Sequence, residues 1–348
     1  MSGFVKLGDL THIRTGKLDA NASSENGQYP FFTCSKEPLR IASYSYDCEC
    51  VLVAGNGDLN VKYYDGKFDA YQRTYIIESA DKRKLLVKYL YFFLDIYVEV
   101  LRTQSIGGVI KYIKLSNLTD ALIPLPSIKR QAEIIECLEK CNTLIDTRQR
   151  EIALIEQTVK SRFIELFGDP ETNPKGWTRQ RLDQICENLD SRRVPITSTD
   201  RKAGNYPYYG ASGIVDYVKD YIFDEDILLI SEDGANLVMR STPIAFSVSG
   251  KVWVNNHAHV VRFESKATQK YIEICFALTD ISGSITGTAQ PKLNQAKLNA
   301  MMFCVPPIEL QEQFATFVEQ TDKSKLAVQK GLQELEILKK SLMQQYFG

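Results

Sequence analysis

An internal duplication constrains the fold of this chain more than any other feature. The segment LPSIKRQ at 125–131 matches VPPIELQ at 305–311, and Phe167-Gly168 matches Phe347-Gly348 with the same offset of 180 residues. A constant offset means that neither copy has an insertion in this stretch. Two similar structural units are therefore expected, because self-similarity at a fixed spacing is typical of repeated folds.

Further matches lie upstream, in the same order in both copies, and their offset drifts slightly because surface loops tolerate differences in length. The matched pairs are LGDL at 7–10 with LDQI at 182–185, GQYPFF at 27–32 with GNYPYY at 204–209, VLVAGNGDL at 51–59 with ILLISEDGANL at 227–237, and KYL at 88–90 with KYI at 270–272. Several blocks in one order indicate a true duplication.

Each copy is expected to contain a domain of mixed strands and helix, followed by a long helix. Short β-branched and aromatic runs, such as Cys50 to Val53 and His259 to Phe263, are bounded by turn-forming residues and predict strands. One amphipathic helix per copy is predicted, at about Lys84 to Val100 and Thr268 to Thr279. The predicted fold class is α+β, with two similar domains joined by two long helices.

The chain of 348 residues, 44% of them hydrophobic, is long enough for two domains that each bury a core. The expected boundaries are 1–126 for the first domain, 127–167 for the first long helix, 168–176 for a linker, 177–307 for the second domain and 308–348 for the second long helix.

The two long helices show the spacing of a coiled coil. No Gly or Pro occurs from Ser127 to Leu166, and apolar residues recur every seven positions. The predicted packing residues are Leu138, Ile145, Ile152, Val159 and Leu166 in the first helix, and Val328, Leu332, Leu335 and Leu342 in the second. Some forty helical residues span roughly 60 Å. An antiparallel coiled coil is expected, with the domains at opposite ends of one rod; the alternative, in which each helix packs only on its own domain, does not account for this length.

No catalytic residue is predicted. The run VLVAGNGDL at 51–59 lacks the third glycine and the following helix of a dinucleotide-binding loop. The acidic cluster at 224–233 lacks a lysine placed as in a metal-dependent nuclease, and Pro306-Pro307 lacks the flanking residues with which an amino-methyltransferase grips a base. The chain is therefore expected to bind rather than to catalyse.

Metal sites, disulfides and membrane segments are not expected either. The eight cysteines include no C-x-x-C pair, and His257 and His259 have no third ligand nearby in the sequence. The N-terminus has no apolar signal core, and the apolar stretch Tyr89 to Val100 is too short to span a membrane. A cytoplasmic protein with reduced thiols is expected.

The net charge of −1 gives no overall attraction to nucleic acid, so any basic binding groups must be grouped locally. Loops of both copies carry the amides, basic groups and exposed aromatics that read nucleic acid. The predicted DNA-binding residues are Lys36, Asn56, Lys62, Tyr63, Gln72, Arg73, Gln104 and Lys111 in the first copy, and Arg192, Arg193, Tyr208, Ser212, Asn236, Arg240, Asn255, His257, Gln290 and Lys292 in the second.

The two copies differ in a loop where two domains that recognise different DNA sequences are expected to differ. The segment GTAQ at 287–290 aligns by the offset of 180 with GGVI at 107–110, so the first glycine is kept while a polar side chain becomes apolar. Two domains of one fold with different loops are expected to read two different sequences.

Several motifs together resemble the specificity subunits of type I restriction-modification enzymes. They are YPFFTCSKEPLR, VAGNGD and KYYDGKFDAYQRTYII in the first copy, YPYYGASGIVDYV in the second, and LP or PP before a long helix in each. The resemblance covers essentially the whole chain. It implies two target-recognition domains that each read half of a bipartite double-stranded DNA target, with a spacer set by an antiparallel coiled coil.

The resemblance also implies partners. Methyltransferase (modification) subunits and ATP-dependent restriction or translocase subunits would assemble with this chain, and S-adenosylmethionine, ATP and Mg²⁺ would be used by those partners and not by this chain. Two alternatives stay open. One is the recognition chain of a fused or type II-like methyltransferase or nuclease, and the other is a coiled-coil scaffold that binds no DNA.

Overall fold

The computed structural model describes residues 3–287 and 289–348 and contains two compact units. Unit 1 comprises residues 1–149 and 330–348, and unit 2 comprises residues 150–329. Each unit holds one predicted domain together with parts of both long helices. The compact units therefore differ from the predicted division, which assigned each long helix as a segment of its own.

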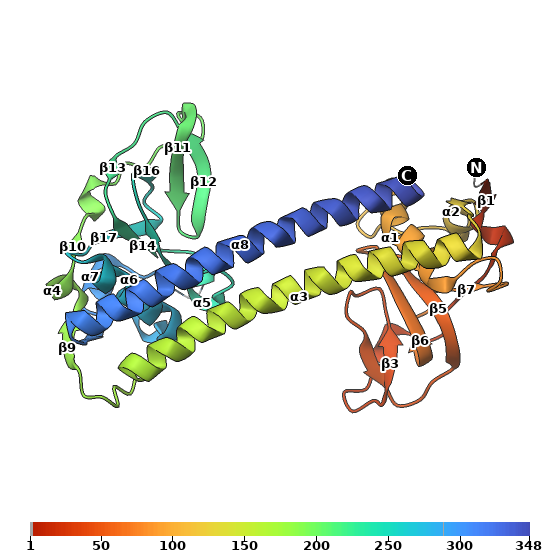
Figure 1. Ribbon diagram of the computed structural model, residues 1–348, viewed down its shortest axis with the longest axis horizontal. Helices are drawn as coiled ribbons and strands as arrows, with labels where there is room; N and C mark the ends of the chain where they lie inside the picture. The colour runs from red at the N-terminus through yellow and green to blue at the C-terminus, as the bar shows by residue number, and fades with distance from the viewer. Residues whose placement is uncertain (1–2, 288) are drawn as a thin grey trace. The chain divides into compact units, whose positions relative to one another are not determined.

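Unit 1 is built on one sheet of six strands (Figure 1), in the order β2-β7-β5-β6-β3-β4. Neighbouring strands are antiparallel except β3 and β6, which run parallel with Phe31 opposite Asp69. Strands β1 and β8 form a separate pair. The elements before the long helix are β1 (Phe4–Lys6), η1 (Leu7–Asp9), β2 (Thr11–Thr15), η2 (Ala20–Ala22), β3 (Tyr29–Phe32), β4 (Leu39–Ile41), β5 (Tyr46–Ala54), β6 (Val61–Ala70), β7 (Thr74–Ser79), α1 (Val87–Gln104), α2 (Leu115–Thr119) and β8 (Leu122–Pro124).

Unit 2 repeats this plan with its sheet divided in two, in the orders β10-β17-β14-β15 and β12-β11-β16-β13, beside the pair β9 and β18. The ten-residue β6 of unit 1 corresponds to the two shorter strands β15 and β16. The elements are β9 (Thr178–Arg181), α4 (Leu182–Ile185), β10 (Glu187–Asn188), η3 (Asp190–Arg192), β11 (Ala203–Gly210), β12 (Gly213–Val218), β13 (Phe223–Asp224), β14 (Ile227–Ser231), α5 (Asn236–Met239), β15 (Ala245–Val248), β16 (Lys251–Val254), β17 (Ala258–Arg262), α6 (Lys266–Leu278), η4 (Ser282–Ser284), α7 (Gln295–Asn299) and β18 (Met302–Val305).

The long helices α3 (Ile128–Phe167) and α8 (Ile308–Phe347) contain 40 residues each and match the predicted segments to within one residue. Prolines precede both, consistent with the tolerance of proline at a helix start. Their predicted packing residues are all buried or half-buried. None of these side chains is fully exposed, which is consistent with the packing role that the seven-residue spacing predicts.

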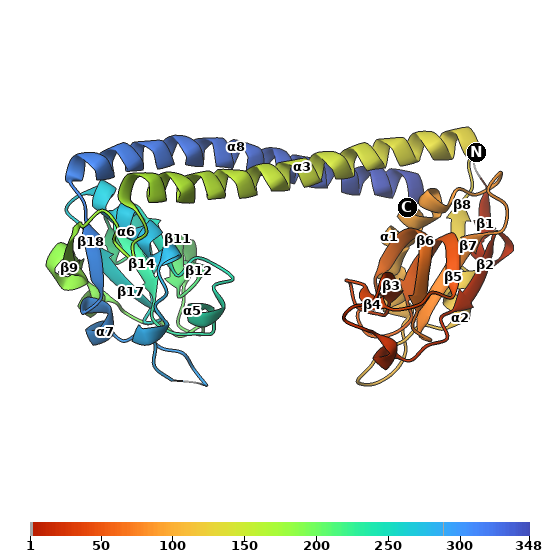
Figure 2. The same cartoon turned by 90° about the horizontal axis from the view of Figure 1, so that it is seen from below.

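The two long helices run antiparallel inside each unit (Figures 1 and 2). In unit 1 the first part of α3 lies beside the last part of α8, where the guanidinium of Arg130 sits 5.7 Å from the ring centre of Tyr346. In unit 2 the last part of α3 lies beside the first part of α8, where the rings of Phe163 and Phe314 are 5.5 Å apart. The predicted antiparallel pairing is therefore confirmed within each unit.

The helices are also part of both domain cores. In unit 1 Leu138 of α3 and Met343 and Phe347 of α8 are buried in the cluster formed by α1 and β5. In unit 2 Phe163 stacks on Tyr271 of α6 at 5.2 Å. No helix among the described residues is long and apolar enough to cross a membrane. All eight cysteines are free thiols.

Candidate nucleic-acid interface

A short hairpin follows helix α1 in unit 1, on the face of the domain opposite the long helices (Figure 2, gold). Ile106 and Tyr112 exchange two backbone hydrogen bonds, with N to O distances of 3.0 and 2.8 Å. The hairpin is fixed to the turn after β5, because the amide of Gly57 donates to the carbonyl of Lys111 at 2.9 Å and the amide of Ile113 donates to Gly55 at 3.0 Å. The backbone hydrogen bonds at the base of the hairpin, rather than contacts of the residues at its tip, therefore hold the loop in place.

Unit 2 contains the same hairpin (Figure 2, blue). Thr286 and Lys292 exchange two backbone bonds of 2.8 and 2.7 Å, the amide of Gly234 donates to Pro291 at 3.0 Å, and the amide of Leu293 donates to Glu232 at 2.8 Å. The hairpin residues occupy positions 180 residues after their counterparts in unit 1. Thr288 lies outside the described residues. The duplication therefore extends to the hydrogen bonds that place this loop.

A glycine closes both hairpins. Gly107 and Gly287 have φ angles of +119° and +81°, in the region that favours glycine. A Cβ at either position would lie 2.5 Å from a backbone carbonyl oxygen, that of Ile110 or Gln290. These constraints explain why the alignment of the two copies keeps this glycine while the residues at the tip change.

A side chain from the neighbouring strand supports each hairpin from below. The hydroxyl of Tyr75 on β7 donates to the carbonyl of Ile113 at 3.2 Å. His259 on β17 reaches the carbonyl of Leu293, the equivalent residue of unit 2, through Nε2 at 2.7 Å. Different side chains therefore support the same carbonyl position in the two copies.

His259 belongs to a buried polar network. Its Nδ1 lies 2.6 Å from Oδ2 of Asp190, and the His259 residue is only 1% exposed. Both ring nitrogens face oxygen atoms, so the carboxylate of Asp190 and the carbonyl of Leu293 hold the ring in place from two sides. Burial is the largest single influence and by itself would raise the pKa of Asp190, but the hydrogen bond and charge of His259, the amide of Val260 and the charge of Arg193 together leave the pKa lowered.

Arg193 and Lys292 extend this network toward the hairpin. Arg193 contacts Glu232 at 2.7 Å and donates to the carbonyl of Ala258 at 2.8 Å. Glu232 also contacts the ammonium of Lys292 at 3.2 Å. Burial opposes ionisation of Glu232, yet these cations and His259 leave its pKa lowered. A chain of charges thus connects the core of unit 2 to its hairpin.

Most of the predicted unit 1 residues come together around the turn between β5 and β6. Lys36 lies 3.9 Å from Asp58 in this turn, and Lys62 contacts Asn60. Asn56 forms a bridge with the hairpin, and the carbonyl of Arg73 accepts from Gly55 at 2.8 Å. These contacts bring together Lys36, Asn56, Lys62, Arg73 and Lys111. Of the other predicted residues, Gln72 adjoins Arg73 in the chain, and Gln104 is the last residue of α1 and accepts from Asn117 at 3.1 Å.

Tyr63 does not belong to this group. Its hydroxyl donates to Glu49 at 3.0 Å, and the ammonium of Lys88 on α1 lies 5.5 Å from its ring centre. Its ring is half-buried against the core. The side chain points toward α1 because alternate residues of a strand face opposite sides of the sheet.

The unit 2 predictions are only partly supported by position. His257, Gln290 and Lys292 are exposed at or beside the hairpin, and Ser212 is exposed in the turn between β11 and β12. By contrast, Tyr208 and Asn255 are 1% and 7% exposed and cannot reach DNA. The prediction is wrong for these two residues, since the sequence does not show which face of β11 is covered or that Asn255, directly after β16, is bonded to Tyr209 of β11.

Three arginines and an asparagine of unit 2 have structural partners. Arg193 is fixed in the buried network, and Arg192 bonds to Glu225 at 2.7 Å. Arg240 donates to the carbonyls of Phe276 and Thr279, both at 2.7 Å, and so caps the end of α6. Asn236 bonds within its own loop to Thr242 and Ser241. These contacts indicate that the four side chains stabilise the loops and are not free to contact DNA bases.

The tip of the unit 1 hairpin is exposed as well as apolar. Val109 is fully exposed and Ile110 is 63% exposed, beside the exposed Lys111. The alignment of GGVI with GTAQ indicates the apolar residues, but it does not show that they project from the surface.

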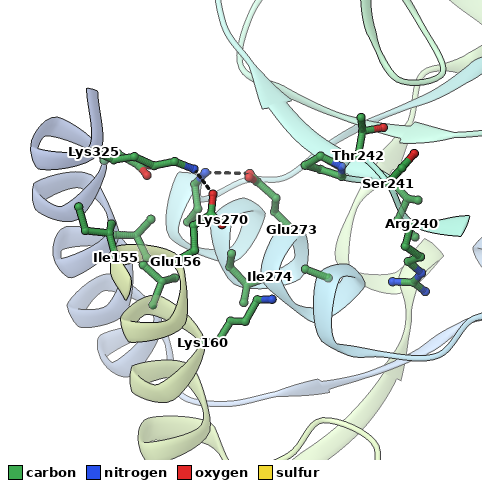
Figure 3. Close-up of a pocket in the computed structure, with 16 residues that line it drawn as sticks. Ile155, Glu156, Lys160, Arg240, Ser241, Thr242, Lys270, Glu273, Ile274 and Lys325 are labelled. Carbon is green, nitrogen blue, oxygen red and sulfur yellow. Dashed lines mark hydrogen bonds and ion pairs between the residues drawn. The ribbon is translucent and has the colours of Figure 1, made fainter. Parts of the chain in front are cut away.

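A second surface lies between the helices of each unit. In unit 2 a groove of about 480 Å³ separates α6 from α3 and α8, and it contains the ion pairs Glu156–Lys325 at 2.7 Å and Lys270–Glu273 at 2.9 Å (Figure 3). In unit 1 an equivalent groove of about 640 Å³ lies between α1, α3 and α8. The residues Glu156 and Lys160 of the first correspond by the offset of 180 to Glu336 and Lys340 of the second.

The unit 1 groove is the more apolar of the two in its central residues. Ile96, Ile145 and Met343 line it, together with Asp95. Burial raises the pKa of Asp95, since it disfavours the charged form of the carboxyl. Among the described residues no three His, Cys, Asp or Glu side chains are grouped so as to hold a metal ion.

Comparisons with known proteins identify the duplicated fold. The profile of the type I restriction modification DNA specificity domain matches residues 2–157 and 174–337. The EcoDI specificity subunit of Escherichia coli is 40% identical over 158 residues, which cover 45% of this chain and 34% of that protein. The chain thus matches about a third of that relative's length.

Two further comparisons cover nearly the whole chain. The MjaVIII specificity subunit of Methanocaldococcus jannaschii is 22% identical over 97% of this chain and 90% of its own length. The crystal structure of a type I restriction-modification S subunit from M. genitalium superposes with a TM-score of 0.65 at 17% identity, over 99% of this chain and 96% of that one. The resemblance expected from the sequence is confirmed: the chain belongs to the family of type I restriction-modification DNA specificity domains, with two copies of that domain.

Proposed function

We propose that this chain is the non-catalytic subunit that gives a type I restriction-modification enzyme its sequence specificity. Each domain would read one half of a bipartite double-stranded DNA target. The observation that carries the proposal is the pair of hairpins, which have the same hydrogen-bonded base and different tips. Two hairpins that share a base but differ in their tip residues are suited to the recognition of two different half-sites.

The long helices would set the distance between the half-sites. Helices α3 and α8 are unbroken over 40 residues, and each contributes one part to unit 1 and the other to unit 2. A helix holds a fixed rise of about 1.5 Å per residue. The number of residues in the two helices would therefore determine the length of the spacer.

The grooves beside α1 and α6 would receive the modification subunits, one at each unit. They are equivalent by the duplication, are lined by helices, and lie among the long helices rather than at the hairpins. Methyl transfer with S-adenosylmethionine, and ATP-driven restriction with Mg²⁺, would be performed by partner subunits. The chain itself would supply recognition and assembly, in the cytoplasm.

Two measurements test the proposal. Mapping of methylated adenines in cells that express the chain with its modification subunits should reveal a bipartite motif, and transfer of the chain alone into another such system should transfer the motif. Binding of the complex to that duplex should weaken steeply with salt, because each phosphate contact releases counterions.

Other outcomes would assign the chain differently. Methylation or cleavage by the purified chain without partners would show a catalytic recognition chain. Absence of salt-dependent DNA binding, alone and in the complex, would instead identify a coiled-coil scaffold.

A further inference from the structure

The tip of the unit 1 hairpin is apolar and unsupported by neighbouring side chains. Val109 is fully exposed, Ile110 is 63% exposed, and Ile106 and Tyr112 at the base are 42% and 38% exposed. Scattered apolar residues on a surface need no explanation, but four within seven positions of one projecting loop form a patch. This patch belongs to no core cluster of unit 1.

The base of this hairpin is nevertheless firmly placed. Two backbone bonds close it, bonds from Gly57 and Ile113 attach it to the turn after β5, and the hydroxyl of Tyr75 supports it. Valine and isoleucine are β-branched, so their χ1 angles are restricted before any partner binds. The tip is therefore a stiff apolar projection on an anchored base.

Cationic groups flank the tip. Lys111 follows it directly and Lys114 lies three residues further, and both are exposed. Within residues 3–287 and 289–348, neither lysine forms an ion pair with a carboxylate. Such a loop is complementary to DNA. The lysines can contact the phosphates, and the apolar tip can contact the stacked bases between them.

The equivalent hairpin of unit 2 has a different tip. Ala289 and Gln290 stand where unit 1 has Val109 and Ile110, and Pro291 stands in the place of Lys111. Its flanking cation, Lys292, is already paired with Glu232. The two hairpins therefore have the same hydrogen-bonded base and differ at the tip. The unit 1 tip is bulky and apolar, whereas the unit 2 tip carries a side chain that can form hydrogen bonds with bases.

We propose that Val109 and Ile110 form a wedge that enters a groove of the target DNA and unstacks one base step in the half-site read by unit 1. Lys111 and Lys114 would hold the adjacent phosphates. The inference rests on the proposed function and adds that unit 1 reads partly through the deformability of its half-site, since unstacking is easiest at flexible pyrimidine–purine steps.

The test uses the full chain in complex with its modification subunits, and a duplex that carries the mapped target. Each base of both half-sites is replaced in turn by 2-aminopurine, whose fluorescence rises when it leaves the stack. Apart from the target adenines, which methyltransferases flip out of the stack, the native complex should raise the signal several-fold at one further step, in a single half-site. The Val109→Ala, Ile110→Gln double variant, which copies the unit 2 tip, should abolish this rise and weaken binding about tenfold.

A reciprocal variant serves as the matched control. Ala289→Val with Gln290→Ile transfers the apolar tip to unit 2, where the same hairpin frame accepts it. This variant should keep the original unstacked step and change recognition only in the other half-site. Both double variants exchange residues between equivalent positions, and unchanged circular dichroism would show that they are folded.

The outcomes separate the wedge from the proposed function. Specific binding by the native complex with no unstacked step other than the flipped target adenines would overturn the wedge and leave the function standing. Loss of affinity when thymine is replaced by deoxyuracil, again without unstacking, would show that the tip contacts a methyl group instead. Absence of specific binding by the native complex would refute the function and the wedge together.

Discussion

At the scale of single residues, the fold constrains the residues that hold the hairpins in place more strongly than the residues at the hairpin tips. Tyr75 and His259 occupy equivalent strand positions and hold equivalent carbonyls, although they are chemically different. The sequence indicated the loops, because the aligned tips differ, but it placed Tyr208 and Asn255 among the readers. Their burial depends on which side of a strand faces the core, and that is set by pairings far along the chain.

The buried pair of His259 and Asp190 leads to a stability prediction. Asp190→Asn should lower the free energy of unfolding of unit 2 by about 1.5–3 kcal/mol, the typical net value of a hydrogen bond to a charged group. Urea unfolding followed by tryptophan fluorescence would measure it, because both tryptophans, Trp177 and Trp253, lie in unit 2.

Asp216→Asn is the matched control for this substitution. Asp216 pairs with Arg201 at 3.3 Å near the surface, and its substitution should lower the unfolding free energy much less than Asp190→Asn, because exposed ion pairs contribute little. Equal losses of unfolding free energy in the two variants would show that the buried Asp190 pair contributes no more to stability than an ion pair near the surface.

The same pair predicts a pH dependence. The pKa of Asp190 is lowered in the folded state, so its contribution is complete above the unfolded value of about 3.9 and is lost as the pH falls through the lower folded value. The unfolding free energy of the native chain should therefore fall more steeply from pH 5 to pH 3 than that of Asp190→Asn. Parallel curves over this range would contradict the assignment.

At the scale of elements, the long helices were predictable and their anchoring was not. The absence of Gly and Pro and the seven-residue spacing fixed the bounds of α3 to one residue. The strongest anchors, Phe163 and Phe314, are fully buried against α6. Their role depends on the shape of the domain core, which no periodic pattern describes.

This anchoring predicts a large effect at one position and a small one at its neighbour. Phe163→Ala should destabilise unit 2 by about 3–5 kcal/mol, because it removes a buried ring that contacts Tyr271, Phe167 and Phe314. Ile164→Ala, at a position 41% exposed, should cost about 0.5 kcal/mol or less. Tryptophan-monitored unfolding would compare them, and similar losses would refute the anchoring role of the aromatic cluster.

At the scale of the whole molecule, the domain plan followed from the duplication, while the composition of the compact units did not. The offset of 180 residues predicted two copies, and the structure and the family profile both contain two. A repeat seen in sequence does not reveal that each unit is completed by helix from the other copy. That exchange depends on the antiparallel pairing of two helices that are separated in the chain by the whole second domain.

The proposed spacing role predicts the result of a matched insertion. Seven helical residues added after Gln149 and seven after Gln329 extend both helices by about 10 Å while keeping the heptad phase. The spacer of the methylated motif should lengthen by roughly three base pairs, at about 3.4 Å each, with both half-sites unchanged. Methylome sequencing would show this directly.

Insertion into α3 alone is the control, because it shifts one helix against the other and should abolish methylation at both spacings. A spacer that stays the same after the double insertion, or half-sites that change with it, would rule out the helices as the determinant of distance.

The division of each unit between distant parts of the chain also affects its synthesis. Unit 2 is one continuous segment, so every residue of its core has left the ribosome once residue 329 has emerged. Unit 1 begins first and is completed last, because Met343 and Phe347 fill its core beside Tyr89 and Phe93. While the second half is translated, the nascent first domain must therefore carry an open apolar seam, and it is during this interval that a chaperone has a surface to hold.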